Sequence, residues 1–446
     1  MEHTHRPQRS NAAYARALDL IPGGTQLISR RPQLYAPGLT PPYAARSQGA
    51  RFWDLDDNGY LDTMMCVGAA ILGYGDEAVD AAVIAQIGRG TASSVSSPLE
   101  LELAEELVAT IPCAEMVRYC KGGGEADAIA VRIARAYTGR EIALFCGYHG
   151  WQDWYLAANL ESAHVLDSHL LPGIQPRGVP SGLQGTALPF AYNDLASLEA
   201  QLDRQRGKVA CIILEASRGA ALPAPGFLAG VRALADAHGA VLIFDEVVTG
   251  FRLAPGGAQE QFGVLPDLAT YAKAISNGYA MGAVVGRREV MQVAAELFIS
   301  STYWSDTIGL VAALTTLREL RRRDALNYVG ELGKAFRERF NAAAAAHGLR
   351  LRAEGLPQQL AIVADASYGD ERRSIKDFYV QEMTRRGFFT SFGVNLCAAH
   401  TTADLDLLDA AWDEVFPRLA AALVAGDLGA QIETTPSVDA FKRQVG

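Results

Sequence analysis

Short apolar runs alternate with amphipathic stretches through the middle of the chain, between about residues 75 and 290. The runs at 142–146, 209–214 and 241–244 are almost continuously apolar, which is typical of strands buried on both faces of a parallel sheet. A stretch such as 125–138 carries apolar residues at helical spacing and is followed directly by a glycine, a common helix end. This alternation predicts an α/β fold with a mainly parallel sheet covered by helices on both faces.

Near the N-terminus, apolar residues flank the turn sequence Asp57-Asn58-Gly59. Asn-Gly between two short strand-like runs, here 51–54 and 60–62, is typical of a β-hairpin with a two-residue type I′ turn. The same stretch resembles the start of a calcium-binding EF-hand loop. Met65, however, stands where that loop needs a bidentate glutamate. We therefore expect a hairpin here and no calcium site.

Beyond residue 310 the pattern changes to long amphipathic helices separated by a few short strands. Residues 310–346 and 402–424 have the spacing of long helices, and Thr401 with Asp404 resembles a capping box at the start of the second. The predicted organisation is an N-terminal segment packing with the small domain (1–50), a large domain (51–310) and a smaller α+β C-terminal domain (311–446).

The composition is that of an ordinary globular protein. The chain has 446 residues, of which 49% are hydrophobic and 20% charged, enough apolar material for a large core. Forty Lys and Arg against fifty Asp and Glu give a net charge of −10, which argues against a nucleic-acid-binding surface. No run approaches about 18 apolar residues, and no secretory signal opens the chain. We expect no membrane span and a cytoplasmic protein.

The cysteines and histidines do not indicate a metal site. Six cysteines stand singly, without a C-x-x-C pair, and eight histidines show no ligand spacing. Residues 157–190 are irregular and rich in Gly, Pro and Ser. A connection of that length suggests an active-site cover or an interface.

Two charged groups follow predicted strands. Asp245 and Glu246 come directly after the apolar run 241–244, and a half-buried carboxylate there needs a positive partner such as a cationic ring nitrogen. Lys273, one of only six lysines, stands among small apolar residues. Burial would lower its pKa and suit its amine to Schiff-base chemistry. Each group also has a simpler interpretation, a solvated strand end for the carboxylates and a surface lysine for Lys273.

A glycine turn and an aromatic residue complete the candidate site. Gly122-Gly123-Gly124 joins a predicted strand to a helix, a place that favours a phosphate, although a tight turn explains it as well. Tyr148 follows the run 142–146 between glycine-rich neighbours and could stack on a flat cofactor. Phosphate turn, aromatic ring, acidic group and lysine together predict pyridoxal 5′-phosphate (PLP).

The order and spacing of these motifs resemble the class III PLP-dependent aminotransferases of fold type I, and among them the glutamate-1-semialdehyde aminomutase-like subgroup. The most specific motifs are Ala-Arg-Ala-Tyr-Thr-Gly-Arg at 134–140, Tyr148-His149-Gly150, and the segment 245–252. The resemblance extends from about residue 21 to 401. It implies a large PLP-binding α/β/α domain with a mainly parallel sheet, and a smaller α+β domain.

The resemblance also implies roles for individual residues. A homodimer with a shared active site is implied, acting on a small-molecule amino donor and a carbonyl acceptor. It implies that Lys273 forms the internal aldimine, that Asp245 binds the pyridine nitrogen, and that Val247 and Tyr148 lie against the two faces of the ring. It further implies that Gly123 and Gly124 bind the phosphate, that Thr302 reaches the phosphate of the neighbouring subunit's cofactor, and that Arg30 binds a substrate carboxylate.

The chain departs from the family at two places. The phosphate loop usually reads Ser-Gly-Thr, whereas residues 122–124 are all glycine, so we expect weaker cofactor retention. Residues Leu27, Val67, Ala220 and Phe392 stand where the aminomutase carries Ser, Trp, Asn and Glu. The favoured prediction is a class III aminotransferase, acting in a role such as amino-sugar or secondary-metabolite biosynthesis. The alternatives are an aminomutase-type isomerase and a non-catalytic protein that has kept the fold.

Overall fold

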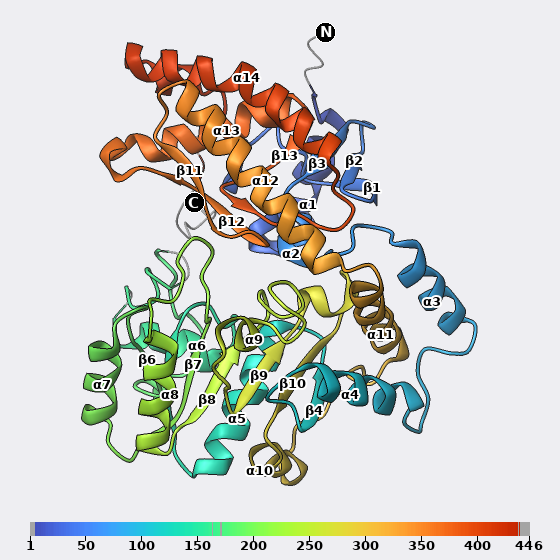
Figure 1. The fold of residues 1–446 in the computed structure, drawn as a ribbon, viewed down its shortest axis with the longest axis vertical. Helices are drawn as coiled ribbons and strands as arrows, with labels where there is room; N and C mark the ends of the chain where they lie inside the picture. Colours follow the sequence, from blue (N-terminus) through green and yellow to red (C-terminus); the bar gives the residue numbers. More distant parts are fainter. Residues whose placement is uncertain (1–4, 163, 170–171, 436, 438–446) are drawn as a thin grey trace. The chain divides into compact units, whose positions relative to one another are not determined.

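The computed structural model describes all residues except 1–4, 163, 170–171, 436 and 438–446. The chain forms two compact units, one of residues 77–326 and one that combines residues 1–76 with 327–446 (Figure 1). The domain limits expected from the sequence, at residues 50 and 310, stay a prediction.

The unit of residues 77–326 is built on a seven-stranded sheet in the order β4-β10-β9-β8-β7-β5-β6. Strands β5 to β9 pair in parallel, and β10 runs antiparallel between β9 and β4, which confirms the expected mainly parallel sheet. The strands are β4 (Met116–Cys120), β5 (Ile142–Cys146), β6 (Ala187–Pro189), β7 (Val209–Leu214), β8 (Val241–Asp245), β9 (Leu268–Tyr271) and β10 (Gly282–Gly286).

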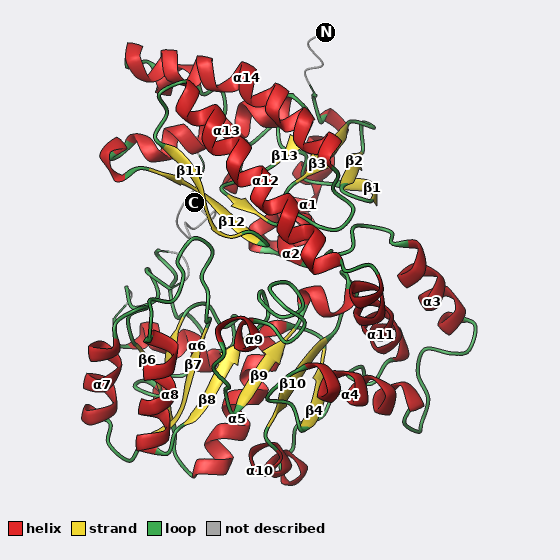
Figure 2. Ribbon diagram, viewed as in Figure 1, coloured by secondary structure: helices red, strands yellow, loops and turns green. Residues whose placement is uncertain are grey.

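The central strands lack a polar face because helices cover the sheet (Figure 2). Every residue of β5, β7 and β8 is buried. Helix α5 packs against β7, β9 and β10, whereas α8 packs against β7 and β8. The helices are α3 (Glu77–Ile87), α4 (Pro98–Thr110), α5 (Gly123–Thr138), α6 (Asp153–Leu156), α7 (Leu195–Arg204), α8 (Phe227–His238), α9 (Ala258–Phe262), α10 (Arg288–Met291) and α11 (Thr307–Arg322), with 3₁₀ turns at Ala157–Leu160, Ser181–Leu183, Lys273–Ser276 and Gln292–Glu296.

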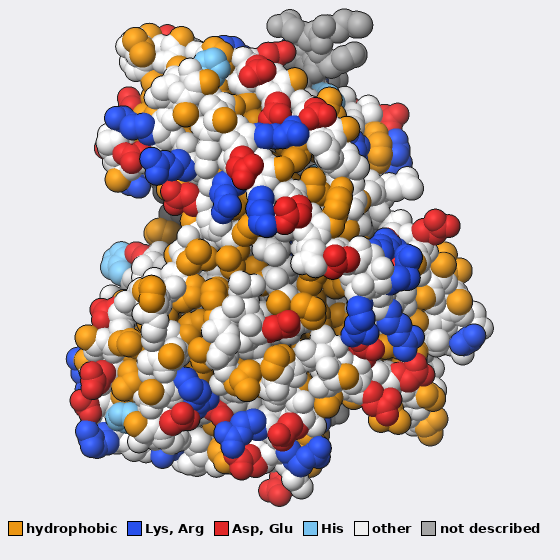
Figure 3. Space-filling view, in the orientation of Figure 1, with side chains coloured by type: hydrophobic (Ala, Val, Ile, Leu, Met, Phe, Trp, Pro, Cys, Tyr) orange, Lys and Arg blue, Asp and Glu red, His pale blue; other side chains and the backbone are white. Residues whose placement is uncertain are grey.

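Oppositely charged side chains lie side by side over α4 and α11 (Figure 3). Arg321 pairs with Glu106 at 2.6 Å, and Arg318 pairs with Glu102 at 3.8 Å. Exposed pairs of this kind each contribute little to stability.

The second unit holds two small sheets and a core of aromatic side chains. Its sheets have the orders β1-β2-β3-β13 and β11-β12-β14. The strands are β1 (Ala44–Gln48), β2 (Arg51–Asp54), β3 (Gly59–Asp62), β11 (Leu351–Leu356), β12 (Gln359–Ala364), β13 (Phe388–Phe389) and β14 (Gly393–Val394). The helices are α1 (Gln8–Leu20), α2 (Met65–Gly68), α12 (Ala325–Ala346), α13 (Glu371–Arg385) and α14 (Thr402–Ala425), with 3₁₀ turns at Pro22–Gly24, Ile28–Arg30, Pro32–Leu34, Ala366–Tyr368 and Leu428–Gln431.

Long-range pairing explains why the two ends of the chain share a unit. β3 pairs in parallel with β13, so the early hairpin is joined to the C-terminal part. Phe340 packs on Trp412 and Phe416 with ring centroids 5.2 and 5.5 Å apart. Helix α14 begins with the expected capping box of Thr401 and Asp404. Across the described part of the chain, no helix combines the length and the apolar character needed to cross a membrane.

The expected hairpin forms, but its turn is longer than expected. β2 and β3 pair antiparallel. In place of a two-residue type I′ turn, the carboxylate of Asp54 accepts hydrogen bonds from the backbone N–H groups of Asp56 and Asn58, both at 2.9 Å. This bonding fixes a wider loop in which Asp57 has a φ of 62°. The type I′ prediction was therefore wrong, because hydrogen bonds to the Asp54 side chain hold the wider turn in place.

Candidate functional site

The polar groups of the site follow neighbouring strands of the large sheet. Because β5, β7, β8 and β9 run parallel, their carboxyl ends lie at one edge of the sheet, where open α/β sheets bind ligands. Tyr148 and His149 follow β5, Glu215 follows β7, Asp245 ends β8, and Lys273 comes two residues after β9. The topology thus gathers side chains from four strands at one edge.

Asp245 is the most firmly held group of the site. Its side chain is only 5% exposed, its Oδ2 lies 2.8 Å from Nδ1 of the fully buried His149, and its Oδ1 accepts the N–H of Val247 at 3.0 Å. The Nε2 of His149 has no hydrogen-bond partner among the described residues. This arrangement suits a histidine that donates from Nδ1 and fixes the direction of the carboxylate.

A second carboxylate, that of Asp127, lies next to this pair. Asp127 is 2% exposed, and its Oδ1 accepts a hydrogen bond from the Thr270 hydroxyl at 2.7 Å. One ligand atom from each of Asp127, His149 and Asp245 lies within 4.8 Å of the others. Burial, followed by the charge of Asp245, raises the pKa of Asp127 well above its usual value. A buried acidic cluster of this kind favours a cation such as a protonated ring nitrogen.

The glycine turn that begins α5 packs closely against the side chains of Val247 and Gln152. A Cβ on Gly123 would lie 2.8 Å from both methyl carbons of Val247, and a Cβ on Gly124 would lie 2.6 Å from Oε1 of Gln152. Gly122, the N-cap, has open space around it, and no side chain caps the helix. The N–H groups of the first turn and the helix dipole therefore face a place suited to a phosphate.

The lysine beside this turn has another role. The ammonium group of Lys121 pairs with Asp306, and its backbone N–H donates to Glu125 at 2.8 Å. Asp306 in turn caps α11, accepting the N–H of Ile308 at 3.0 Å. The Lys121 ion pair joins the strand before the turn to the start of α11.

Lys273 begins a 3₁₀ turn directly after β9 and has a φ of 50°. A lysine gains nothing from this left-handed conformation, so the surrounding fold must impose it, as is common at functional sites. Asp245 lies opposite Thr270 in the pairing of β8 with β9. Lys273 therefore follows the strand next to that of Asp245.

Glu215 was not identified from the sequence, although it directly follows a buried strand as Asp245 does. Its Oε2 accepts the N–H of Tyr148 at 3.0 Å and lies 3.6 Å from Nε of Arg218. A Cβ on Gly147, whose φ is 122°, would lie 2.6 Å from the same oxygen. Glu215 therefore sets the course of the loop that carries Tyr148, whose own side chain is 44% exposed.

The contacts described above do not include the predicted residues Thr302 and Arg30. Thr302 is exposed on the segment before α11. Arg30 belongs to the other unit, where it is exposed and its Nη2 donates to Sγ of Cys66 at 3.3 Å. The part played by each in the site stays a prediction.

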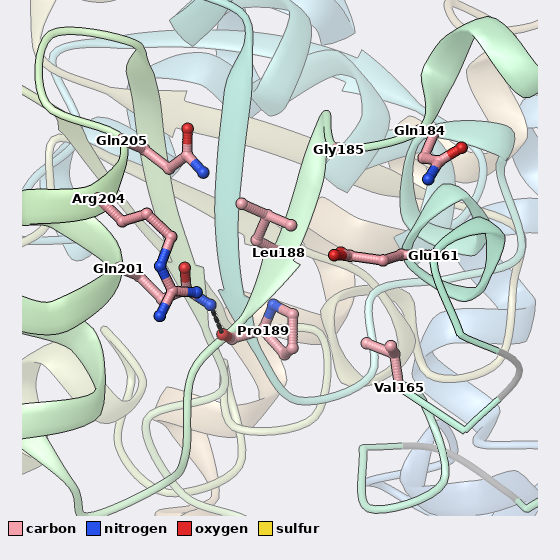
Figure 4. Close-up of a pocket in the computed structure, with 9 residues that line it drawn as sticks. All are labelled: Glu161, Val165, Gln184, Gly185, Leu188, Pro189, Gln201, Arg204 and Gln205. Carbon is pink, nitrogen blue, oxygen red and sulfur yellow. Dashed lines mark hydrogen bonds between the residues drawn. The ribbon is translucent and has the colours of Figure 1, made fainter.

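A surface cavity of about 610 Å³ beside the edge strand β6 holds none of the predicted residues (Figure 4). Leu188 and Pro189 of β6 form its floor, and Glu161 and Arg204 approach it from opposite sides. Its lining comes from the irregular region 157–190, from α7 and from the residue after α7.

Known proteins match the whole architecture. A family model described as "Aminotransferase class-III" matches residues 35–400. The chain is 35% identical to a 3-aminobutyryl-CoA aminotransferase of Cloacimonas acidaminovorans over 406 residues, which cover 89% of this chain and 94% of that protein. It is 34% identical to a glutamate-1-semialdehyde 2,1-aminomutase of Chloroflexus aurantiacus over 445 residues, with 93% and 98% covered.

Solved structures agree with these sequence relatives. The PLP internal aldimine form of the FumI protein of Sphingopyxis sp. MTA144 superposes with a TM-score of 0.85 at 27% identity, covering 96% of this chain and 99% of that one. An omega-transaminase from Sphaerobacter thermophilus superposes with a TM-score of 0.82 at 27% identity, covering 92% and 98%. Both comparisons span the two units of the chain.

The glycine turn gives a testable prediction. Gly123→Ala should lower the free energy of unfolding by about 1–3 kcal/mol, because its methyl group would overlap Val247. Gly122→Ser is the matched control. Its side chain meets open space, and serine caps a helix at least as well as glycine, so the change should stay within about 0.5 kcal/mol. Urea denaturation measures both, and equal stability of the two variants would contradict the packing of Val247 under the turn.

Proposed function

The chain belongs to the class III aminotransferases, and we propose that it moves an amino group from a small-molecule donor to a separate carbonyl acceptor. The observation that carries the proposal is the buried Asp245, held by His149 at the end of β8, beside the strand that Lys273 follows. An anion fixed in this way suits a protonated pyridine nitrogen, and the neighbouring lysine suits the cofactor aldehyde.

The residues present fit PLP at each of its functional groups. The first turn of α5 offers N–H groups to a phosphate, with glycine where a Cβ would strike Val247 or Gln152. Asp245 offers a buried, oriented carboxylate to the ring nitrogen. We propose that Tyr148 and Val247 lie against the two faces of the ring, and that Lys273 holds the cofactor through its side-chain amine.

Each side chain has a definite task in the proposed mechanism. Bound PLP supplies an electron-poor ring that stabilises negative charge at the substrate carbon. Asp245 keeps the proton on the ring nitrogen, while His149 Nδ1 and the Val247 N–H hold the carboxylate in place. With the cofactor bound, the amine of Lys273 would take a proton from the substrate carbon as general base and return it as general acid.

Transfer between two molecules is favoured over rearrangement of one. Val67 and Ala220 stand where the aminomutase carries Trp and Asn, and an aminotransferase is among the relatives at 35% identity. Aminomutases are also among the relatives, so the isomerase remains the second candidate. We assign the exposed Arg30 to a substrate carboxylate, and the substrates to small amino and carbonyl compounds.

The proposed location is the cytoplasm. All six cysteines are free thiols, and five of them are buried, which is usual in a reducing compartment. The proposed partners are small molecules and a second copy of the chain. The net charge of −10 does not favour a polyanion such as a nucleic acid.

Lys273→Ala should reduce amino transfer by about 10²–10⁴-fold, because the general base and acid is lost. The measurement is the absorbance change of PLP-loaded protein mixed with a panel of amino donors, such as alanine, glutamate and 3-aminobutyrate. Lys208→Ala, at an exposed lysine before β7, is the matched control and should keep the wild-type rate. An unchanged rate in Lys273→Ala would contradict the assignment.

The same assay separates the alternatives. Without a carbonyl acceptor, a transferase converts no more donor than there is bound cofactor; added acceptor restores turnover. Turnover of one amino compound without any acceptor would favour the isomerase. If no donor changes the spectrum of the PLP-loaded protein, the chain is a non-catalytic member of the family.

We also propose a homodimer in which Thr302 reaches the phosphate bound by the partner subunit. The exposed Thr302 lies between Phe298 and Tyr303, which are 86% and 69% exposed, and exposed aromatic side chains of this kind often mark an interface. Thr302→Val should weaken PLP binding about tenfold, the value of one hydrogen bond to a charged group. Ser301→Ala should bind like wild type. A monomer in sedimentation velocity, or wild-type affinity in Thr302→Val, would contradict the proposal.

A further inference from the structure

The second buried carboxylate of the site, Asp127, has no part in the mechanism given so far. It lies in the first half of α5, on the face that packs against the sheet, and is only 2% exposed. Thr270, which donates to its Oδ1 at 2.7 Å, pairs across β8 and β9 with Asp245. The topology therefore places Asp127 directly beside the carboxylate that faces the ring nitrogen.

The surroundings of Asp127 disfavour a second negative charge. Asp245 at the end of β8 and Glu215 after β7 both raise its pKa, and burial contributes more than either. Cys120 on β4 and Tyr148 after β5 also interact with it, and His149 lies within 4.8 Å. Two neighbouring carboxylates removed from water cannot both ionise cheaply, so one keeps a proton.

The hydrogen bonds decide which carboxylate keeps the proton. Asp245 accepts the Val247 N–H and faces Nδ1 of His149, two donors that stabilise its charge. Asp127 accepts a hydrogen bond from the neutral hydroxyl of Thr270 on one oxygen, and a carboxylate oxygen of Asp127 lies within 4.8 Å of one of Asp245. A hydrogen bond between two neighbouring carboxyl groups needs a proton, and that proton belongs to the group with the weaker set of donors.

We propose that Asp127 is a positioning residue that stays protonated and donates a hydrogen bond to Asp245, so that Asp245 alone carries the charge that meets the ring nitrogen. This inference rests on the proposed role of Asp245 as the partner of that nitrogen. Asp127 thereby adds a further donor that fixes the direction of the Asp245 carboxylate.

The proton can be measured in the protein without cofactor. The infrared difference spectrum of wild type minus Asp127→Asn, at neutral pH, should contain the C=O band of a protonated carboxylic acid. Asparagine keeps an oxygen for Thr270 and an N–H donor for Asp245, so this variant should fold. A difference spectrum with only the bands of an ionised carboxylate would overturn the proposal.

Stability against pH provides a second readout. In the unfolded chain Asp127 ionises near its ordinary value of about 3.9, whereas the folded chain retains the proton to higher pH. The stabilising effect of that proton is complete below about pH 4 and is lost as the pH rises toward the folded pKa. The unfolding constant of wild type should therefore rise relative to Asp127→Asn, by up to about tenfold per pH unit. Parallel curves would overturn the proposal.

Cofactor binding tests the positioning role. Asp127→Asn should bind PLP within about threefold of wild type, with the same pH dependence of its absorbance, whereas Asp127→Val, which lacks the donor, should bind about tenfold more weakly. Asp377→Asn is the control, because Asp377 is a buried carboxyl with a raised pKa in the other unit; its PLP affinity should equal that of wild type.

The outcomes separate this inference from the proposed function. Tenfold weaker binding in Asp127→Asn would mean that a charge on Asp127 matters, and it would overturn the inference. If the acid band is present but wild type does not bind PLP, the protonated state stands and the proposed function fails. If Asp127→Val does not fold, the comparison of Asp127→Asn with wild type still decides the point.

Discussion

The hydrogen bond between Nδ1 of His149 and Oδ2 of Asp245, at 2.8 Å, is the interaction on which the rest of the site depends. An ionised carboxylate that is 5% exposed is costly unless donors compensate for lost water. His149 and the N–H of Val247 supply them, and each also fixes a neighbouring segment. Val247 packs under the glycine turn of α5, so the anion site and the phosphate site are built from one connected set of contacts.

The parallel sheet brings these contacts together, because its strands end at one edge. Its central strands are fully buried, which leaves little freedom in where each strand ends. The residues just beyond those ends carry the unusual backbone, with a φ of 122° at Gly147 and 50° at Lys273. A rigid sheet can hold such conformations because the packing behind them outweighs their cost.

The local pattern of the sequence predicts the buried strands and Asp245, whereas the place of Asp127 depends on the order of the strands in the sheet. Continuous apolar runs marked the buried strands, and polar residues directly after them marked Asp245. Asp127 stands on an amphipathic helix, where a polar residue normally faces water, and only the adjacency of β8 and β9 shows that it faces Asp245. The hairpin turn was wrong because the Asp54 side chain replaced the expected backbone turn. Roles for Arg30 and Thr302 stay predictions, since they depend on surfaces beyond one unit or one chain.

The most direct test of the central claim is a spectrophotometric titration with PLP of wild type, Asp245→Asn and Glu246→Gln. Glu246 is the neighbouring buried carboxylate, held by the N–H groups of Ala258 and Gln259 at 2.8 and 3.0 Å, and serves as the matched control. We expect Asp245→Asn to bind PLP at least about tenfold more weakly and Glu246→Gln to bind like wild type. Wild-type affinity in Asp245→Asn would contradict the account, because the buried anion would then not be the partner of the ring nitrogen.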